Sequence, residues 1–398
     1  MPAADTPGAG SRFYTGRRET ALLAVLMFGN FVVGTGILLP AAMLTDLASG
    51  LSISLADAGA LILVSGIVCA AGAPLAAAAT TSVDRRYLLV STLVLAAAAN
   101  AASAAAGSIG TLNIARIGMA IAAAIFTPQA ASALGVLLPA ERRGRGITMI
   151  FIGWSLATVC GMPLGNLIAE TAGWRTAYVM LAVLSVLAAA AVWVAMPAGV
   201  RVPRLDGAAW RKVLTSPALL LVLLVTAING TGHFTHFTYL NPSLKRSLEA
   251  SGTLMTAILV WWGLAATLGN VAAARLVHRA GPPRAAVVTL LSMVLGLAVW
   301  GLADSTLAAV FVAATLWGGG TFATMSIQQA RLAATAPDLT SASIALNTSA
   351  IYIGQAAGAT LGGAMITSGR MEQLAFAGSA ILVGAVAVSL IAMRFERR

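Results

Sequence analysis

The sequence predicts an all-α membrane protein that crosses a bilayer about twelve times, in two bundles of six helices, with both termini in the cytoplasm. Hydrophobic residues fill 59% of its 398 positions and charged residues only 9%. A soluble domain carries roughly a quarter of charged residues, because its surface has to be wetted. The mean hydropathy of +0.89 indicates that lipid is the solvent. The length then allows about twelve spans of roughly 20 to 25 residues with short connections.

The positions of the basic residues predict the orientation. A net charge of +11 would suggest nucleic-acid binding in a soluble protein. Here 19 of the 24 lysines and arginines fall in alternate connections and the two tails, four fall in the other connections, and Arg116 lies within a span. This asymmetry follows the positive-inside rule and places the basic set in the cytoplasm. The excess of arginine over lysine and the abundant alanine indicate GC-rich coding DNA, which favours a bacterial plasma membrane.

The apolar segments form two groups of six on either side of the longest polar stretch. The expected spans are 20–44, 55–80, 87–106, 111–138, 146–170 and 174–197, then 215–242, 252–277, 285–302, 306–334, 340–366 and 372–393. The predicted divisions are a cytoplasmic tail (1–19), an N-terminal bundle (20–197), a cytoplasmic linker (198–214) and a C-terminal bundle with a short cytoplasmic tail (215–398). Repeated six-span halves imply a transporter with its substrate site at mid-membrane between them.

The first span is expected to stay in the protein, and nothing predicts an enzyme, a cofactor or a metal site. The apolar run after Arg17 and Arg18 is too long for a signal peptide. A dinucleotide-like Gly-Thr-Gly lies at residues 34–36, inside an apolar span, and lacks the third glycine of that motif. Cys69 and Cys160 lie in separate apolar runs and match neither a disulfide framework nor a zinc site.

Small residues recur every four positions in two spans at equivalent places in the halves. They are Gly153, Ala157, Gly161 and Gly165 in the fifth span and Gly354, Gly358 and Gly362 in the eleventh. Such ladders let helix backbones approach closely in a membrane. Static packing is one interpretation of each ladder, and their equivalent places favour surfaces that move against each other. Pro163 removes one backbone hydrogen bond and predicts a kink.

Polar side chains at depth are the candidate substrate contacts. They are Asn30, Gln129, Asn229, His233, His236, Gln328, Asn347 and Gln355, with Trp261 beside Trp262 as a stacking wall. Each polar side chain has an alternative role in pairing with a neighbouring helix, and the tryptophans have one in the aromatic belt of the membrane interface. A cavity of this kind would be neutral, which disfavours polycations and quaternary ammonium compounds.

Proton coupling needs a group that titrates within a span, and none of the 13 acidic residues lies near mid-membrane. Asn229, His233 and His236 fall at i, i+4 and i+7, on one helix face. Histidine has the ordinary pKa nearest neutrality, so His233 and His236 are the proton-coupling candidates, with Arg116 as a third. The alternatives are that the imidazoles bond to neighbouring helices and that Arg116 extends to the outer surface. No acid or cysteine joins the histidines to complete a metal site.

Two spans resemble those of the major facilitator superfamily. Gly153, Gly161, Pro163 and Gly165 resemble the fifth-helix antiporter motif of its drug exporters, with Met162 where a second glycine usually stands. Leu112 and Arg116 resemble the motif whose arginine is assigned to proton transfer, with Met119 and Ala120 replacing its usual Gln and Gly. In the first span, the similar branch commonly places an acid after Gly-Thr, where this chain has Gly36.

Two loops resemble the signature loop motif of the same superfamily. After the eighth span the matching residues are Leu276, His278, Arg279 and Gly281, with His278 where the family has Asp. After the second span they are Arg85, Arg86 and Leu89; Asp84 directly precedes them, and Thr81 stands at the motif's Asp position. The resemblance covers nearly the whole chain and is closest to the arabinose-efflux-permease and chloramphenicol-exporter-like branch.

The resemblance implies a major facilitator fold and a secondary active transporter of the drug–proton antiporter type. We expect a monomer that exports a small amphipathic or apolar compound, antibiotic-like, drug-like or sugar-like, in exchange for protons, by alternating access. A protein of this kind would act in drug efflux and antibiotic resistance. Its partners would be the substrate, protons and the lipid bilayer, without nucleic acid. The alternatives are an uncoupled facilitator of a neutral solute and a non-transporting membrane sensor of the same fold.

Overall fold

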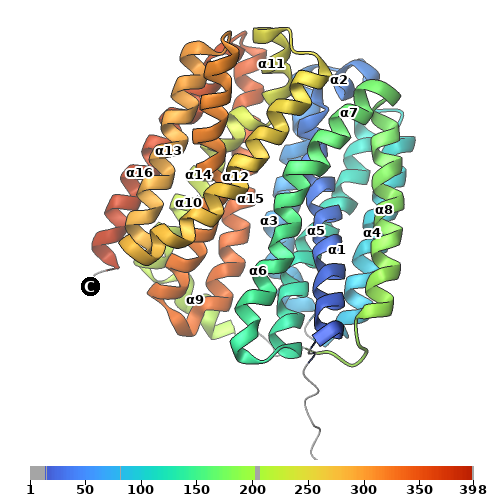
Figure 1. Ribbon diagram of the computed structural model, residues 1–398, viewed down its shortest axis with the longest axis vertical. Helices are drawn as coiled ribbons and strands as arrows, with labels where there is room; N and C mark the ends of the chain where they lie inside the picture. Colours follow the sequence, from blue (N-terminus) through green and yellow to red (C-terminus); the bar gives the residue numbers. More distant parts are fainter. Residues whose placement is uncertain (1–13, 15, 81, 202–206, 397–398) are drawn as a thin grey trace, which may run out of the picture.

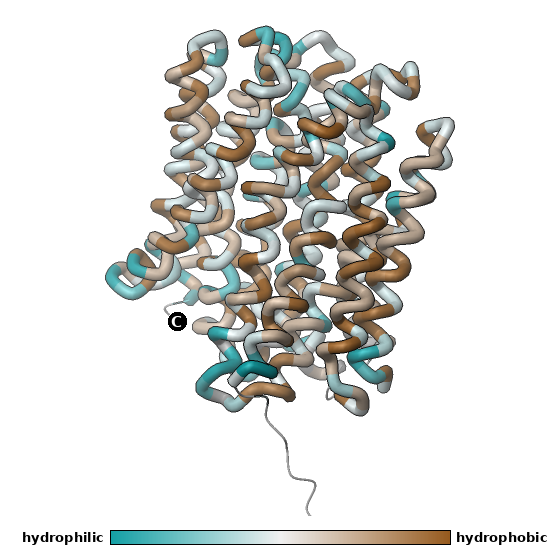
Figure 2. Tube along the Cα trace, turned by 45° about the vertical axis from the view of Figure 1, so that its right-hand side comes forward, coloured by the Kyte–Doolittle hydropathy of each residue, from teal (hydrophilic) through white to brown (hydrophobic). Residues whose placement is uncertain are grey.

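The computed structural model describes residue 14 and the ranges 16–80, 82–201 and 207–396 (Figure 1). Thr81, most of the N-terminal tail and the middle of the linker lie outside the described residues. Two groups of long helices stand side by side (Figure 1), and hydrophilic residues gather mostly toward the two ends of the bundle (Figure 2). The end that carries the linker helix and the basic connections is the cytoplasmic end.

The N-terminal half consists of nine consecutive helical elements. They are α1 (Gly16–Ala42), α2 (Leu44–Leu51), α3 (Leu55–Ala79), α4 (Arg85–Ala105), α5 (Ile109–Leu137), α6 (Ala140–Leu156), the π-helical turn η1 (Ala157–Gly161), α7 (Met162–Ala172) and α8 (Trp174–Ala195). The elements α6, η1 and α7 run on as one crossing helix (Figure 1). The half thus has six crossing helices and the short periplasmic helix α2.

The linker helix α9 (Gly207–Leu214) leads into the C-terminal half. Its elements are α10 (Pro217–Phe237), α11 (Leu240–Leu248), α12 (Gly252–Ala280), α13 (Pro282–Ala303), α14 (Leu307–Thr335), η2 (Pro337–Leu339), α15 (Thr340–Thr367), η3 (Met371–Gln373) and α16 (Leu374–Phe395). The short helix α11 follows α10 at the periplasmic end as α2 follows α1 (Figure 1). The second half therefore repeats the arrangement of the first.

Eleven helices in the described part of the chain are long and apolar enough to cross a membrane. The twelfth crossing helix, α15, is 28 residues long and packs between α3 and α10. Its amides and glycines make it more polar than its neighbours. The predicted all-α major facilitator fold is confirmed.

Local sequence signals start several of these helices. Ser54, Ser108, Ser216 and Ser251 each accept a hydrogen bond from a backbone N–H in the first turn of α3, α5, α10 and α12. Within the bilayer every backbone polar group has to find a partner inside the protein. These caps therefore place the helix ends at the membrane surfaces.

Pro163 produces a π-helical turn in the fifth crossing helix, where the sequence predicted a kink. Proline has no N–H with which to bond the carbonyl of Val159, and its ring would clash with that group in a regular α-helix. The helix widens over Ala157–Gly161, and the N–H of Met162 bonds instead to the carbonyl of Ala157, five residues back. The turn frees the backbone around Thr158 and Val159, which α12 of the other half approaches at Gly263.

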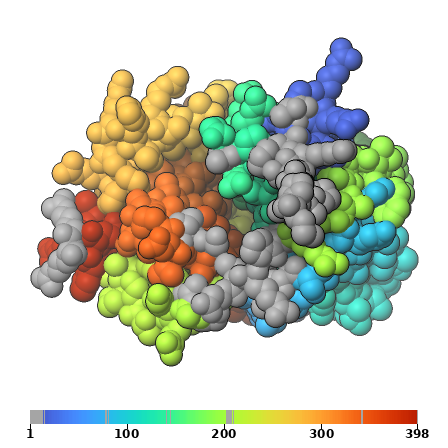
Figure 3. All heavy atoms as spheres, turned by 90° about the horizontal axis from the view of Figure 1, so that it is seen from below, coloured from blue at the N-terminus to red at the C-terminus, as the bar shows by residue number. Residues whose placement is uncertain are grey.

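One hydrophobic core lies mainly in the N-terminal half and includes Tyr352 of α15, and another lies mainly in the C-terminal half and includes Leu38 and Met162 of α1 and α7. The halves also pack against each other through α3 and α15. At the cytoplasmic end the molecule is hollowed between the halves (Figure 3). Trp154 on α6 is half-buried and packs against the cores of both halves. The two halves therefore pack together toward the periplasmic end and separate toward the cytoplasmic end (Figure 3).

Candidate functional site

Four polar side chains of the C-terminal half lie where α10, α14 and α15 pack together. Thr226 Oγ1 donates to Asn347 Oδ1 at 2.7 Å. Among the described residues, Asn347 Nδ2, Asn229 Oδ1 and both polar atoms of the Gln328 amide have no hydrogen-bond partner, although all three side chains are buried. A buried amide without a partner is costly, so these groups are ready to bond a ligand or water.

The polar side chains of the N-terminal half form a connected network. Asn30 Nδ2 donates to the carbonyl of Ile150 at 2.8 Å, and Thr127 Oγ1 donates to Asn30 Oδ1. Trp154 Nε1 donates to Thr127 Oγ1 at 3.4 Å and links the network to the boundary between the halves. Gln129 is buried close by on α5. These groups are already satisfied, in contrast to those of the other half.

The N-terminal set lies deeper from the cytoplasmic helix ends than the C-terminal set. With about 1.5 Å of rise per residue, Thr226, Gln328 and Asn347 lie roughly 10 to 14 Å from the cytoplasmic ends of their helices. Asn30 and Thr127 lie roughly 15 to 21 Å from the same end by the same measure. Uncharged polar side chains from both halves therefore lie between the cytoplasmic helix ends and the middle of the bundle.

Two predicted contacts lie elsewhere. Gln355 is buried on α15, roughly 12 Å further toward the periplasmic end than Asn347. Trp261 is 46% exposed on the outside of α12, donates from Nε1 to Thr315 Oγ1 at 2.9 Å and packs against Phe311. The structure does not bring Trp261 to the other candidates, and its indole lies on the outer face of the bundle.

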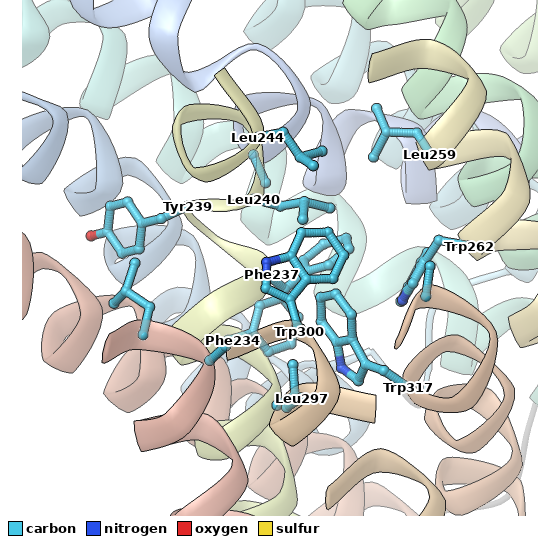
Figure 4. Close-up of a cluster of buried hydrophobic side chains, with 14 of the residues drawn as sticks. Phe234, Phe237, Tyr239, Leu240, Leu244, Leu259, Trp262, Leu297, Trp300 and Trp317 are labelled. Carbon is cyan, nitrogen blue, oxygen red and sulfur yellow. The ribbon is translucent and has the colours of Figure 1, made fainter. Parts of the chain in front are cut away.

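Both histidines of α10 lie inside a cluster of aromatic rings, which we call the aromatic cluster. Its other members are Phe234, Phe237, Trp262, Trp300 and Trp317, from α10, α12, α13 and α14 (Figure 4). His233 stacks on Phe237 at 4.8 Å and on Trp262 at 5.9 Å between ring centroids. The cluster belongs to the core that also contains Leu38 and Met162 of the N-terminal half, so movement between the halves changes its packing.

Hydrogen bonding separates the two histidines. Trp317 Nε1 donates to His233 Nδ1 at 3.0 Å, which in a neutral imidazole leaves the proton on Nε2. His236 lies 4.9 Å from the Trp300 ring and 5.4 Å from the Trp317 ring, and neither of its nitrogens has a partner among the described residues. His233 therefore bonds to a neighbouring helix, whereas His236 keeps both nitrogens free.

Arg116 points into the N-terminal half and does not extend to the outer surface. Its side chain is fully buried, and Nη2 donates to the carbonyl of Gly36 on α1 at 2.6 Å. The guanidinium carbon lies 5.9 Å from the Tyr178 ring on α8. Its Nε and Nη1 have no hydrogen-bond partner among the described residues.

The glycine ladders join helices within each half and do not form the expected surface between the halves. A Cβ on Gly153 would lie 2.8 Å from the backbone nitrogen of Phe31, and one on Gly161 would lie 2.9 Å from Thr35 Cγ2, both on α1. A Cβ on Gly358 would lie 2.5 Å from the carbonyl oxygen of Thr231 on α10. Gly165, Gly354 and Gly362 make similar contacts with α1 or α10. The opposite faces of the same crossing helices meet the other half.

A network of amide side chains, which was not predicted from the sequence, closes the periplasmic end. Asn241 of α11 donates to the Ala42 carbonyl at 2.7 Å and to Asn166 Oδ1 at 3.1 Å, and it accepts from Thr45 Oγ1 at 2.7 Å. Asn166 Nδ2 donates to Thr256 Oγ1 at 3.2 Å. We call these five residues the periplasmic latch. The visible signal was an asparagine near the periplasmic end of an apolar run in each half.

Two charged contacts join the halves beside the latch. Lys245 Nζ lies 3.7 Å from Asp46 Oδ1, and the N–H of Gly252 donates to Glu170 Oε1 at 2.9 Å. Both contacts connect the same periplasmic segments as the latch. They strengthen the closure at the membrane surface, where water screens them more than the buried amides.

The cytoplasmic loop motifs connect elements within each half. Asp84 caps α4 at the N–H of Arg86 and also accepts from the N–H of Gly199 at 2.6 Å. Arg85 Nη1 donates to the carbonyl of Thr80 at 2.6 Å. His278 and Arg279 lie in the last turn of α12, and Gly281 turns the chain into α13 with φ +76°.

A buried ion pair fixes the cytoplasmic end of α14. Arg331 Nε donates to Glu396 Oε1 at 2.7 Å, and its Nη1 donates to Ser389 Oγ at 2.9 Å. Burial raises the pKa of Glu396, and the adjacent Arg331 guanidinium opposes that rise. This contact holds α14 to α16 within the C-terminal half.

Sequence comparisons agree with this architecture. The family model described as Major Facilitator Superfamily matches residues 26–242, more than half of the chain. The inner membrane transport protein YdhP of Escherichia coli is 29% identical over 347 residues, 87% of this chain and 89% of that protein. A probable sugar efflux transporter of Mannheimia succiniciproducens is 24% identical over 397 residues, 97% of this chain and 98% of that protein.

Solved structures of transporters share the fold. The peptide transporter POT superposes with a TM-score of 0.79 at 16% identity over 98% of both chains. A bacterial homologue of the human lysosomal transporter Spinster, inward-facing and occupied, superposes with a TM-score of 0.74 at 17% identity, covering 96% of this chain and 98% of that one. At these identities the likeness shows the fold alone.

Proposed function

The chain belongs to the Major Facilitator Superfamily, as a multi-pass transporter of the bacterial inner membrane, and from this premise we propose that it exports a small, uncharged, amphipathic or apolar organic compound by alternating access. The observation that carries the proposal is the set of amides on Asn229, Gln328 and Asn347 that lack partners among the described residues. None of the 13 acidic residues of the sequence lies near the middle of a crossing helix. Neutral amides bond hydroxyl, carbonyl and amide groups and do not attract cations.

The substrate would bind between the two amide levels. From the cytoplasmic recess it would meet Gln328 and Asn347 on one side and Trp154 on the other. The indole and nearby aliphatic side chains would contact its apolar surface, and the amides would bond its polar groups. Drug-like, antibiotic-like and sugar-like compounds all fit this description, and one relative's name specifies sugar efflux.

Proton antiport would drive the export, and His236 is our choice for the proton site. Neither of its nitrogens is engaged in a hydrogen bond among the described residues, so the unprotonated nitrogen of the neutral ring is free to gain a proton, and the surrounding indole rings would stabilise an imidazolium through cation–π contacts. The aromatic cluster is part of the core that also contains Leu38 and Met162 of the N-terminal half, so opening the periplasmic end would change the environment of His236. Coupling requires such a linkage between proton affinity and conformation.

A facilitator of a neutral solute is the second candidate. It is favoured by one observation: in the part of the chain that the structure describes, no ion pair places a carboxylate among the central amides. Such a protein would move solute only down its gradient, whereas the antiporter accumulates it. The two functions share the substrate site and differ in their response to a pH gradient.

The substrate proposal can be tested in a pump-deficient bacterial host exposed to a broad panel of toxic uncharged compounds. Expression should raise resistance to at least one of them. Gln328→Leu and Asn347→Leu should each raise the apparent KM for its efflux by about 10-fold, as expected for the loss of a buried hydrogen bond. Asn113→Leu, a matched amide replacement near the periplasmic end of α5, should behave like the parent. Equal efflux by all three variants would contradict the placement of the site.

A further inference from the structure

Arg116 is a buried cation for which the structure shows no negative partner. It takes part in none of the ion pairs of the described residues, and its ionisable neighbours are Tyr178 and Cys69, which are neutral when protonated. One of its three nitrogens bonds to the Gly36 carbonyl, and the other two have no partner. A guanidinium stays charged in proteins, so the site carries a full positive charge in a low-dielectric interior.

The groups around Arg116 have free hydrogen-bonding capacity as well. The Tyr178 hydroxyl is buried and has no partner among the described residues. Asn100 on α4 makes one weak contact, in which Nδ2 donates to Met119 Sδ at 3.7 Å, and its Oδ1 is unpartnered. Met119 is one turn along α5 from Arg116. A guanidinium, a phenol and an amide can all donate hydrogen bonds to one anion.

The Met119 side chain fills the space beside Gly36, next to the guanidinium. A Cβ at that position would lie 2.7 Å from Met119 Cε, the end of a flexible side chain. A thioether changes rotamer easily and adapts to irregular space, so its movement would expose the guanidinium from the α1 side. Glycine at position 36 therefore leaves only a movable side chain between α1 and the charge.

We propose that Arg116 forms a buried anion site in the N-terminal half. A small monovalent anion, either chloride or the carboxylate of an organic acid, binds the free Nε and Nη1 beside Gly36, with the Tyr178 hydroxyl as a further donor. The anion neutralises the guanidinium and stabilises the packing of α1, α5 and α8. This site is separate from the central amides, and its existence does not depend on whether the exported compound is neutral.

Thermal unfolding of the purified full chain in detergent tests the proposal. Sodium chloride or sodium acetate replaces sodium methanesulfonate at constant ionic strength, and tryptophan fluorescence reports Tm. The wild type should show a saturable rise of about 2 to 4 °C. A rise with chloride but not acetate identifies an inorganic anion site, and a rise with acetate but not chloride identifies a carboxylate site. The absence of a saturable rise with both salts overturns the proposal.

Two variants at one position provide the control. Gly36→Asp supplies a carboxylate from α1, so it should raise Tm in methanesulfonate and abolish the response to added anion. Gly36→Asn has nearly the same size and no charge, so it should not raise Tm in methanesulfonate. Equal Tm values of the two variants in methanesulfonate would also overturn the proposal. The measurement needs no transport, so the absence of an anion response would not contradict the proposed export. In the same way, the absence of export would not contradict the anion site.

Discussion

The replacement Asn241→Ala should shift the protein toward a state that is open to the periplasm. Asn241 makes three side-chain hydrogen bonds across the latch, and each is worth about 0.5 to 1.5 kcal/mol net. Their loss should cost the closed arrangement about 2 to 4 kcal/mol, which changes the equilibrium between the two states roughly 30- to 1000-fold. Thr45→Val removes one of the three bonds and should produce a smaller shift in the same direction.

Cysteine labelling measures this shift. Leu244→Cys, in a background in which Cys69 and Cys160 are replaced by alanine, places a thiol that is fully buried beside the latch in the closed state. A membrane-impermeant maleimide applied from the periplasmic side should label it faster when Asn241→Ala is added. Ser379→Ala removes a buried hydrogen bond to Val294 within the C-terminal half and should leave the rate unchanged. Unchanged labelling in folded Asn241→Ala protein would refute the latch.

The other predictions concern helix packing at Gly161, the membrane topology and the outward-facing Trp261. Gly161→Leu should block transport while expression persists, because a side chain there displaces Thr35 on α1; normal efflux would contradict the close contact. Reporters that work only in the periplasm should be active in the periplasmic connections and inactive in the cytoplasmic ones, and the reverse would overturn the orientation. The fusion sites are Gly110 and Ser305 for the first set and Arg86 and Arg143 for the second. Trp261→Phe should leave the KM for efflux unchanged, since Trp261 faces outward, and a large change would place it in the site.

The sequence was sufficient for the fold because the membrane imposes strong constraints on composition. Apolar segments of span length and the asymmetry of basic residues follow from the energy of burying charge in lipid. The predicted ends of the spans were less accurate where a short helix follows a crossing helix directly. The predicted spans 20–44 and 215–242 each merge a crossing helix with the start of a short periplasmic helix, α2 or α11, because both short helices begin with apolar residues.

The site was only partly predictable, because pairing between distant segments leaves no local signal. Asn241 bonds to residues of α1, α2 and α7 that are distant in the chain, so the latch appeared only in three dimensions. Helix periodicity put His233 and His236 near one face, yet it could not show that Trp317 binds one and leaves the other free. Spacing revealed the glycine ladders, but their partner helices depend on which face of α1 and α10 packs against them.

Uphill transport in proteoliposomes tests the proposed antiport most directly. The compound identified by the resistance panel is supplied together with an imposed pH gradient across the vesicle membrane. We expect accumulation against the concentration gradient in the wild type and in His233→Gln, and only downhill exchange in His236→Gln. A wild-type protein that moves the compound downhill but ignores the pH gradient would contradict antiport and favour the facilitator. Full accumulation by His236→Gln would show that the coupling proton does not bind in the aromatic cluster.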